Sequence, residues 1–528
     1  MQRRKFLNAL SAGAVLPVIL NGFSFKSFAA SPLLQALANA TNNDHVLVLI
    51  QLNGGNDGLN TVIPLEYYAE LNQARPNIII PQNQVLALNG TTLTGLHPSM
   101  TGLQQLYNNS LMSIVQGVSY PSPNLSHFRA TDIWLTASDS AQVLSTGWAG
   151  RYLDYEYPNY PVGYPNATVP DPLALQIGST LSLALQGPAV SMGMSITDPT
   201  NFYNLINGIQ DPAPNTNYGK ELTYVRQISQ QSQAYSSVIT NAANNITQQS
   251  TAYPTAGTNS LADQLKIVAR LIAGGLKTKI YMVNLGGFDN HAGQVVSGAT
   301  TTGTHADLLS ALSVAISAFM DDLNFLSVAD RVVGMTFSEF GRRIISNASD
   351  GTDHGVGAPM MLFGNKVQNG LVGTNPIIPA GAGVNDNVAM QYDFRSVYAS
   401  VLQDWFCVPN ADLNQILLQN FQSLQLIQPS ACSIGIEEQN LRAGESIVSN
   451  YPNPFTSSTY VTYKSKGGYV LLQVFDAEGK LLKTLAEGEQ PEGTYKVWYE
   501  NEGHAAGTYY LRMQNERYQQ VKNMVVVR

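Results

Sequence analysis

The sequence predicts an α/β protein with a doubly wound, mainly parallel sheet, followed by a small C-terminal all-β sandwich. Short, continuous apolar runs alternate with helical patterns along most of the chain. Continuous apolar runs are typical of strands buried on both faces, and their alternation with helices favours a parallel sheet covered on both sides. Near residue 446 the pattern changes to short alternating strands separated by Gly, Asn and Asp turns, which is typical of a β-sandwich.

The expected strands of the α/β domain are the apolar runs of the chain. They occupy residues 46–52, 111–118, 173–177, 279–285, 332–337 and 360–363. Ser260 is expected to cap a helix that ends at Gly274, and residues 304–326 repeat apolar side chains every three or four positions. Asp393 is expected to cap the last helix of the domain. Residues 218–257 interrupt this alternation and are rich in neutral polar side chains, which fits either a surface helix or cap over the site or a polar linker.

Length and composition limit the classes of function. The 528 residues are enough for more than one domain, and the net charge is -8 with only 12% charged residues. No basic stripe is present, so we expect no nucleic-acid partner. The abundance of neutral polar residues is common in exported proteins. The chain has two cysteines, Cys407 and Cys432, and their spacing leaves open whether they pair.

Residues 1–30 have the pattern of a signal peptide. A charged head of Arg3, Arg4 and Lys5 precedes an apolar stretch over residues 6–20 and small residues before position 30. The two arginines followed by Phe-Leu resemble a twin-arginine export signal, and an ordinary secretory signal is the alternative. The apolar stretch is short for a membrane span and no other segment qualifies, so we expect no transmembrane span.

Residues 425–445 are expected to form a polar linker to the C-terminal domain, residues 446–528. This last domain contains YPNPF at 451–455, FDAEG at 475–479 and AGTYY at 506–510, and it ends in a strand over residues 522–528. These motifs resemble the C-terminal sorting domain of type IX secretion. The resemblance implies that the type IX secretion machinery of a Bacteroidetes-type bacterium delivers the protein, which is then secreted or displayed on the outer-membrane cell surface. An immunoglobulin-like binding module is the alternative.

Acidic and histidine side chains flank several of the expected strands within residues 44–424. They are Asp57, Asp289, His291, Glu339, Asp353 and His354. In open α/β sheets the ligand site lies beyond the carboxyl ends of the strands, so we expect these side chains at one edge of the sheet. Oxygen and nitrogen ligands together predict one or two divalent metal ions, namely zinc, manganese or calcium. Each residue alone also has a simpler interpretation, as a helix cap, a paired carboxylate or a core histidine.

Ser126 is the candidate nucleophile. It lies where a helix is expected to begin, and a helix N-terminus stabilises negative charge such as that of an alkoxide. Ser126 serves equally well as a plain N-cap, and His127 is either a further metal ligand or an ordinary helix residue. Arg129 or Arg342 is expected to hold an anionic group of the substrate.

Five motifs resemble one known family. They are Gly54–Gly58, Ser126–Phe128, Gly287–His291, Ser338–Arg342 and Gly351–Gly355. Together they resemble the sulfatase-like, twin-arginine-exported family known as domain of unknown function 1501, of the alkaline phosphatase and sulfatase superfamily. The resemblance covers about residues 44 to 410. It implies an alkaline phosphatase-like sheet with metal ligands at Asp57, Asp289, His291, Glu339 and His354 and the nucleophile at Ser126.

The chain departs from that superfamily at three places. Asp289 and His291 are closer in sequence than in true phosphatases, and Phe340 follows Glu339 where those enzymes carry a histidine. Phe128 and Ala130 occupy the places of the proline and arginine that direct formylglycine formation in sulfatases. We therefore do not expect formylglycine, and the number of metals and the activity itself stay open.

The combined expectation is a secreted, metal-dependent hydrolase of phosphate or sulfate esters that acts on an anionic small molecule or glycan. The alternative is a non-catalytic cell-surface or glycan-binding protein that retains a structural metal site. Trp148, Tyr152, Tyr155, Tyr157 and Tyr160 provide aromatic rings that either stack on sugars or pack at the rim of the domain.

Overall fold

The structure is a computed structural model that describes residues 19–20, 23–24, 44–167, 169–199, 235–429, 432, 446–453, 455–476, 480–501, 503–514 and 519–527. Two compact units are present, Asn43–Ala431 and a second that comprises Met1–Asn42 and Cys432–Arg528. The expected signal peptide lies outside the described residues, apart from a short antiparallel pair of β1 (Ile19–Leu20) and β2 (Phe23–Ser24). Both cysteines, Cys407 and Cys432, are disulfide-bonded.

The α/β unit is built on a nine-stranded sheet, which confirms the predicted fold class. The strands have the order β15-β7-β14-β11-β3-β10-β8-β9, with β16 beside β7. Their bounds are β3 Val46–Asn53, β7 Met112–Ser119, β8 Ala174–Ile177, β9 Met194–Ile196, β10 Ile280–Gly286, β11 Val332–Phe337, β14 Ala358–Phe363, β15 Gly370–Val372 and β16 Tyr392–Asp393. Only β14 runs antiparallel to its neighbours, β7 and β11, and the other pairs are parallel.

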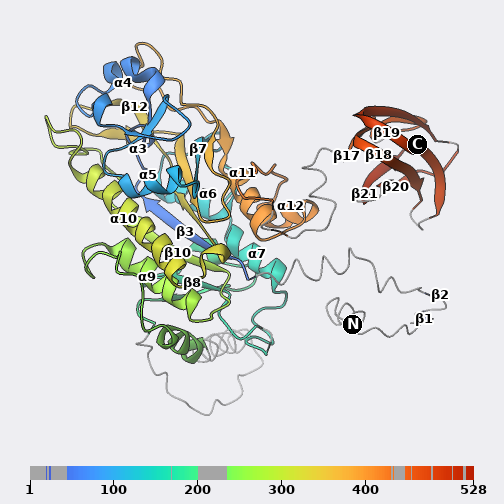
Figure 1. The fold of residues 1–528 in the computed structure, drawn as a ribbon, viewed down its shortest axis with the longest axis horizontal. Helices are drawn as coiled ribbons and strands as arrows, with labels where there is room; N and C mark the ends of the chain where they lie inside the picture. Colours follow the sequence, from blue (N-terminus) through green and yellow to red (C-terminus); the bar gives the residue numbers. More distant parts are fainter. Residues whose placement is uncertain are drawn as a thin grey trace. The chain divides into compact units, whose positions relative to one another are not determined.

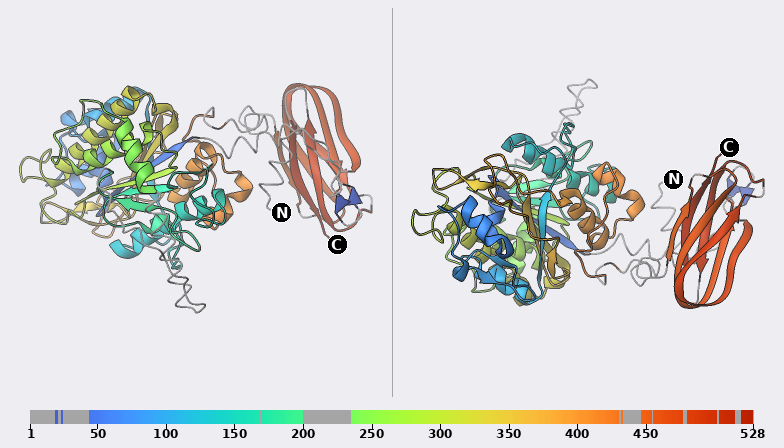
Figure 2. Two further views of the ribbon diagram at one scale, coloured as in Figure 1. Left: turned by 90° about the horizontal axis from the view of Figure 1, so that it is seen from below. Right: turned by 90° about the horizontal axis from the view of Figure 1, so that it is seen from above.

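Helices cover both faces of this sheet (Figures 1 and 2). The helices on one face are α5 (Thr101–Asn108), α9 (Ser260–Ala273) and α10 (Thr304–Phe325). Those on the other are α6 (His127–Thr136), α7 (Trp148–Glu156), α11 (Phe394–Ser400) and α12 (Leu413–Leu417). Strand β3 shows how one continuous apolar run serves both layers, because successive side chains of a strand point to opposite faces. Val48 and Ile50 belong to the first core, whereas Leu47 and Leu49 belong to the second.

The helix boundaries agree with the sequence except at one cap. Asn259, and not Ser260, caps α9 by accepting a hydrogen bond from the backbone of Ala262, and the helix ends at Gly274 as expected. Asp393 caps α11 as expected. Helix α10 is long and apolar enough to cross a membrane, yet more than half of its apolar window is buried inside the domain, as in the core helix of a soluble protein.

Part of the polar segment 218–257 joins the core. Residues 218–234 lie outside the described residues, whereas residues 235–245 are helical. Tyr235 and Ile239 are buried in the same core as α9. Residues 235–245 are therefore a packed helix, and residues 246–257 have no regular secondary structure.

Short elements surround the carboxyl edge of the sheet. They are a three-stranded sheet of β4 (Val62–Pro64), β6 (Thr94–Leu96) and β5 (Leu86–Ala87), a hairpin of β12 (Arg342–Ser346) and β13 (Thr352–His354), and helices α3 (Gly58–Thr61) and α4 (Tyr68–Ala74). Single 3₁₀ turns occupy Leu65–Tyr67, Gln82–Gln84, Leu183–Leu185, Ala329–Arg331 and Asn410–Asp412, and a π-helical turn occupies Val401–Trp405.

The C-terminal unit is all-β, as predicted. Its strands are β17 (Ser446–Tyr451), β18 (Ser458–Phe475), β19 (Leu481–Glu500), β20 (Gly507–Gln514) and β21 (Gln519–Val526). They form a five-stranded antiparallel sheet in which the long strand β18 pairs with β19 on one side and with β17 and β20 on the other. Alternate residues such as Val470, Leu472 and Val474 fill one apolar core.

Candidate functional site

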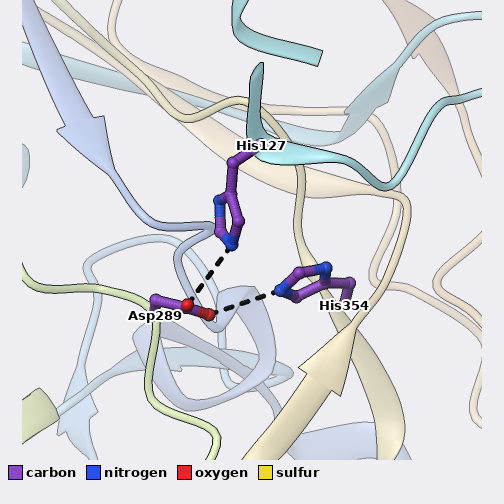
Figure 3. A group of neighbouring side chains, drawn as sticks. All are labelled: His127, Asp289 and His354. Atoms are coloured by element: carbon purple, nitrogen blue, oxygen red, sulfur yellow. Dashed lines mark hydrogen bonds and ion pairs between the residues drawn. The ribbon is translucent and has the colours of Figure 1, made fainter. Parts of the chain in front are cut away.

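Four side chains from three separate segments of the sequence converge at the carboxyl end of strand β10. Asp289 lies three residues after the end of this strand, and its carboxylate is 48% exposed. His127, the first residue of α6, points its Nε2 at Asp289 Oδ2 over 3.3 Å. His354, at the end of β13, points its Nε2 at Asp289 Oδ1 over 3.3 Å (Figure 3). His291 approaches the same oxygen over 3.1 Å.

Each imidazole is held from behind through its Nδ1 atom. The Nδ1 of His127 lies 2.8 Å from Oε1 of Glu339, and the Nδ1 of His354 donates to the backbone carbonyl of Leu125 over 2.8 Å. The Nδ1 of His291 lies 3.3 Å from a carboxylate oxygen of Asp353. Because these partners are acceptors, they place the proton on Nδ1 and leave the lone pair of each Nε2 facing Asp289. Metal-binding histidines are commonly fixed in this way.

Two observations show that the donor set fits a metal ion. The Nε2 atom of His127 is buried and has no hydrogen-bond partner among the described residues. The Nε2 atoms of His291 and His354 lie only 2.8 Å apart, so their two lone pairs repel unless a cation or a proton lies between them. One ligand atom from each of His127, Asp289 and His354 lies within 4.8 Å of the others, which is close enough to share one ion.

Glu339 supports this cluster through His127, which in turn faces Asp289. Its side chain is 4% exposed, and its Oε1 accepts hydrogen bonds from His127 and from the backbone of Gly54. Gly54 has a φ of +122°, and a Cβ at this position would lie 2.3 Å from the backbone nitrogen of Asp289. The glycine thus lets the loop after β3 approach the loop of Asp289, which is a reason for the Gly-Gly pair in the motif.

Arg342 is buried beneath Asp289 and organises the same loops. Its guanidinium donates to the carbonyls of Gly54, Gly55, Phe288 and Thr352 and, over 2.7 Å, to Oδ1 of Asp289. Burial alone would raise the pKa of Asp289, but the hydrogen bond and charge of Arg342 lower that pKa overall. Arg342 therefore keeps Asp289 ionised, and it has no donor directed at the cleft described below.

The pKa of His354 is also lowered. Burial is the main cause, and the nearby positive charge of Arg342 acts in the same direction, whereas the hydrogen bond to Leu125 opposes it. A lowered pKa keeps the imidazole neutral near pH 7, which is the form that binds a metal ion.

Asp57 does not join the cluster. Its carboxylate forms a buried ion pair with Arg75 over 2.8 Å, with side-chain exposures of 2% and 0%, and it also accepts from Gln294 over 2.7 Å. It caps α3 by accepting from the backbone of Leu59. Burial by itself would raise the pKa of Asp57, but Arg75, His305 and these hydrogen bonds lower it overall. The carboxylate is thus engaged on all sides as a structural group, so we leave Asp57 out of the proposed ligand set.

The other predicted catalytic residues lie at the margin of the site. Ser126 is exposed at the N-cap position of α6, but its hydroxyl makes no capping hydrogen bond. Arg129 donates through Nη2 to the carbonyls of Asp139, Ser140 and Gln142. Its Nη2 thus holds the loop after α6 in place, whereas Nη1 is buried and makes no hydrogen bond among the described residues. That Arg129 binds an anion stays a prediction.

A cleft of ≈ 460 Å³ opens beside the cluster. Its lining residues are Leu125, His291, Arg343, Asp353, His354, Val384 and Asn385. Two of the candidate ligands, His291 and His354, thus form part of the cleft wall. A substrate in this cleft would contact both the imidazoles and the guanidinium of Arg343.

Two residues of the candidate site were missed or left open by sequence reasoning. His127 contacts both Glu339 and Asp289, and the only local signal for it is its place directly after Ser126. Arg343 lines the cleft although its neighbour Arg342 was the expected anion-binding residue. The alternation of side chains along β12 is the signal that separates the two arginines.

The aromatic side chains on and just after helix α7 pack into the core. Trp148, Tyr152, Tyr157 and Tyr160 are buried, with exposures of 1%, 2%, 7% and 8%. Tyr155 donates its hydroxyl to Asp412. Of the two interpretations left open by the sequence, the structure supports packing, because these rings form part of the second core, where Trp148 stacks on Tyr398 and Tyr152 on Phe406.

The fold and site define an α/β protein with a histidine-rich cluster at the carboxyl edge of its sheet. Residues 118–396 match the family described as "Protein of unknown function (DUF1501)". This match covers more than half of the chain, so the protein belongs to that family. Residues 449–527 match the "Secretion system C-terminal sorting domain". The protein therefore carries a type IX secretion sorting domain and is exported, to the cell surface or beyond it.

No curated protein matches the chain. Among solved structures it resembles an alkaline phosphatase superfamily protein from Vibrio parahaemolyticus, with 10% identity, a TM-score of 0.33 and coverage of 92% of this chain and 91% of the other. A Bacteroides thetaiotaomicron protein of glycosaminoglycan metabolism has 10% identity, a TM-score of 0.34 and coverages of 84% and 89%. A Pseudoalteromonas sulfatase has 8% identity, a TM-score of 0.34 and coverages of 88% and 85%. Likenesses of this size carry no argument about activity.

Proposed function

We propose that this protein is an exported, metal-dependent hydrolase of phosphate or sulfate esters. The observation that carries the proposal is the convergence of three imidazole Nε2 atoms on one carboxylate, with each imidazole held through Nδ1. Buried nitrogens are rarely left without a hydrogen bond, yet Nε2 of His127 makes none and faces only the Asp289 carboxylate over 3.3 Å.

The residues that would hold the ion are His127, Asp289 and His354, with His291 as a fourth ligand. Three imidazoles and one carboxylate suit zinc or manganese better than calcium, which takes oxygen ligands. Bound there, such an ion would act as a Lewis acid toward an ester oxygen. Glu339 and the Leu125 carbonyl would keep two of the imidazoles in the binding tautomer, while Arg342 would keep Asp289 ionised and oriented.

Ser126 is the side chain that we propose as the nucleophile. It directly precedes His127 at the N-terminus of α6, so the two residues lie next to each other in the chain. Its exposure and the absence of a capping hydrogen bond leave the hydroxyl available for a substrate. The non-catalytic alternative keeps the same metal ligands and differs only in lacking turnover.

The test combines metal content with turnover. Purified protein is assayed by elemental analysis and against aryl phosphates and aryl sulfates, together with the variants His127→Ala, His354→Ala and Asp289→Asn. We expect bound metal in the wild type and a loss in metal affinity in each variant that exceeds roughly 10- to 100-fold, the usual cost of changing only an outer-shell partner, because each variant removes a ligand. His504→Ala is the matched control, since His504 belongs to the C-terminal sheet region.

Each outcome separates the alternatives. Unchanged metal binding in His127→Ala and His354→Ala would exclude the proposed site. Metal binding without turnover of any ester would favour the non-catalytic alternative. Turnover that depends on both the metal and the three side chains supports the hydrolase.

A further inference from the structure

We infer that Arg343 binds an oxyanion of the substrate in the cleft, which makes it a specificity-determining residue of this protein. The inference rests on the proposed function of the neighbouring cluster and adds the chemical class of the ligand. Arg343 is the only lysine or arginine among the described residues that line the cleft. It shares this lining with His291 and His354, so one ligand would contact all three residues.

The guanidinium of Arg343 is fixed along one part and free along the other. Its Nη1 donates to the carbonyl of Val384 over 2.8 Å and to Oδ1 of Asn385 over 3.0 Å. Within the described residues, Nε and Nη2 of Arg343 make no hydrogen bond. These two atoms form one edge of the planar fork, the geometry that binds a carboxylate, phosphate or sulfate through two parallel hydrogen bonds.

The charge of Arg343 lacks a partner within ion-pair distance. None of the carboxylates in the described residues lies within 4.0 Å of its nitrogens. The nearest candidate in the cleft wall, Asp353, already accepts from His291 over 3.3 Å and from Asn347 over 3.2 Å. Asp353 lies outside ion-pair distance but still interacts with the charge of Arg343. Because no carboxylate contacts the guanidinium directly, its Nε and Nη2 remain available to an anion from solution.

The two successive arginines on β12 thus have different tasks. Arg342 pairs across the hairpin with His354 and is buried against five acceptors around Asp289. Arg343, the next residue, lines the cleft, because adjacent side chains of a strand point to opposite faces.

The surrounding side chains indicate an organic anion. Val384 is 72% exposed and Leu125 is partly buried, so the cleft offers apolar contacts beside the cation. Asn385 adds an amide that is already oriented by Arg343. A volume of ≈ 460 Å³ lies in the range of small-molecule sites, about 300–1,000 Å³. The expected ligand is therefore an ester of sulfuric or phosphoric acid, or an acidic sugar that carries a carboxylate.

Anion binding is measured directly, so that the test does not depend on turnover. Inorganic sulfate, inorganic phosphate and glucuronate are titrated calorimetrically into the full-length protein, with and without added zinc. We expect Arg343→Gln to weaken binding of the preferred anion by about 10- to 100-fold, the usual effect of losing charged hydrogen bonds. Arg343→Lys should recover only part of the lost affinity, because lysine keeps the positive charge but lacks the planar guanidinium that forms two parallel hydrogen bonds.

Arg331→Gln is the matched control. Arg331 directly precedes β11, whereas Glu339 follows the other end of this strand. The Arg331→Gln variant therefore removes the same charge at a position far from the cleft. Metal content and melting temperature of each variant show that the cluster and the fold persist. Preference for sulfate or phosphate identifies the ester group as the ligand, whereas preference for glucuronate identifies a carboxylate of an acidic sugar.

Two results would overturn the inference. One is a wild-type protein that binds none of the three anions, and the other is an Arg343→Gln variant that binds them as tightly as the wild type. Failure of the proposed function looks different, because the anions would still bind through Arg343 while no ester is hydrolysed. If Arg343→Gln hydrolyses the ester with an unchanged KM, the proposed hydrolase function is retained, but Arg343 has no part in substrate binding.

Discussion

Asp57 and Asp289 lie in the same Gly-Gly-X-Asp pattern but in opposite environments. Each follows a Gly-Gly-X pattern after one of two neighbouring parallel strands, β3 and β10. The side chain of Asp57 is 2% exposed and paired with Arg75, whereas that of Asp289 is 48% exposed and surrounded by three imidazoles. The two aspartates thus share a position at the end of a strand, and the side chains that surround each one decide its role.

The offset between the two strands explains part of this difference. Gly286 is paired with Asn53, so Asp289 corresponds to Asn56 and Asp57 comes one residue later. Asp57 then opens helix α3, which turns its carboxylate toward the backbone of Leu59 and toward Arg75. A buried ion pair contributes to structure only while both partners remain, whereas an exposed carboxylate among imidazoles is free to bind a cation.

The largest expected effect breaks the buried pair. Asp57→Ala leaves Arg75 charged and buried without its counter-ion, so we expect unfolding to become easier by about 3–5 kcal/mol. Asp289→Ala should cost the chelator-treated protein less, because Asp289 is 48% exposed and the buried guanidinium of Arg342 keeps its four backbone carbonyl acceptors. Urea unfolding monitored by circular dichroism measures both.

The double variant Asp57→Ala/Arg75→Met is the control for this prediction. It removes the unpaired charge and should recover part of the lost stability. Equal losses in Asp57→Ala and Asp289→Ala would mean that the two carboxylates do not differ as described.

The second largest effect is expected when the pH is lowered, which should destabilise the buried region around Asp57. His305 lies 2.9 Å from Asn56 and beside His97, and burial lowers the pKa of His305 to about 4 and that of His97 to about 3. Both pKa values lie below those of the unfolded chain, about 6.5, so the unfolded state binds protons first as the pH falls. Stability is therefore complete above pH 6.5 and declines toward pH 4, by roughly 3 kcal/mol for His305, at about 1.36 kcal/mol per pKa unit.

This pH dependence is measured by urea unfolding of the chelator-treated protein between pH 7.5 and 4. Asp57 and Arg75 also face His305 electrostatically, and Asp57 keeps a lowered pKa. His305→Gln cannot titrate, so its stability should fall less steeply over this range than that of the wild type. An identical slope in the two proteins would assign the acid sensitivity to other groups.

The smallest effect on stability is expected at Ser126. Because its hydroxyl makes no capping hydrogen bond, Ser126→Ala should change the free energy of unfolding by less than about 0.5 kcal/mol. As the proposed nucleophile, it should nevertheless lose all turnover while its metal content stays unchanged. Asn259→Ala is the comparison, because Asn259 does cap α9 and its loss should cost about 0.5–2 kcal/mol. A destabilised Ser126→Ala protein that retains activity would restore the N-cap interpretation.

Local patterns were sufficient to predict much of this molecule. The apolar runs correspond to strands β3, β7, β8, β10, β11 and β14 because continuous apolar sequence is what a doubly covered sheet requires. The same pattern predicts that residues after β10 and before β14 lie at one edge, where Asp289, His291 and His354 do meet. The turn-rich alternation of the C-terminal domain and the cap at Asp393 are equally local features.

Tertiary structure alone decided which of these side chains belong together. Arg75 comes from the end of α4 to remove Asp57 from the cluster, and His127 comes from the start of α6 to join it. The aromatic side chains on and just after α7 are buried and form part of the core. On β12, Arg342 lies inside the domain whereas Arg343, on the other face of the strand, lines the cleft. Periodicity and turns depend on immediate neighbours in sequence, whereas the Asp57–Arg75 ion pair joins residues 18 positions apart and the cluster joins separate segments, and no local pattern encodes such partners.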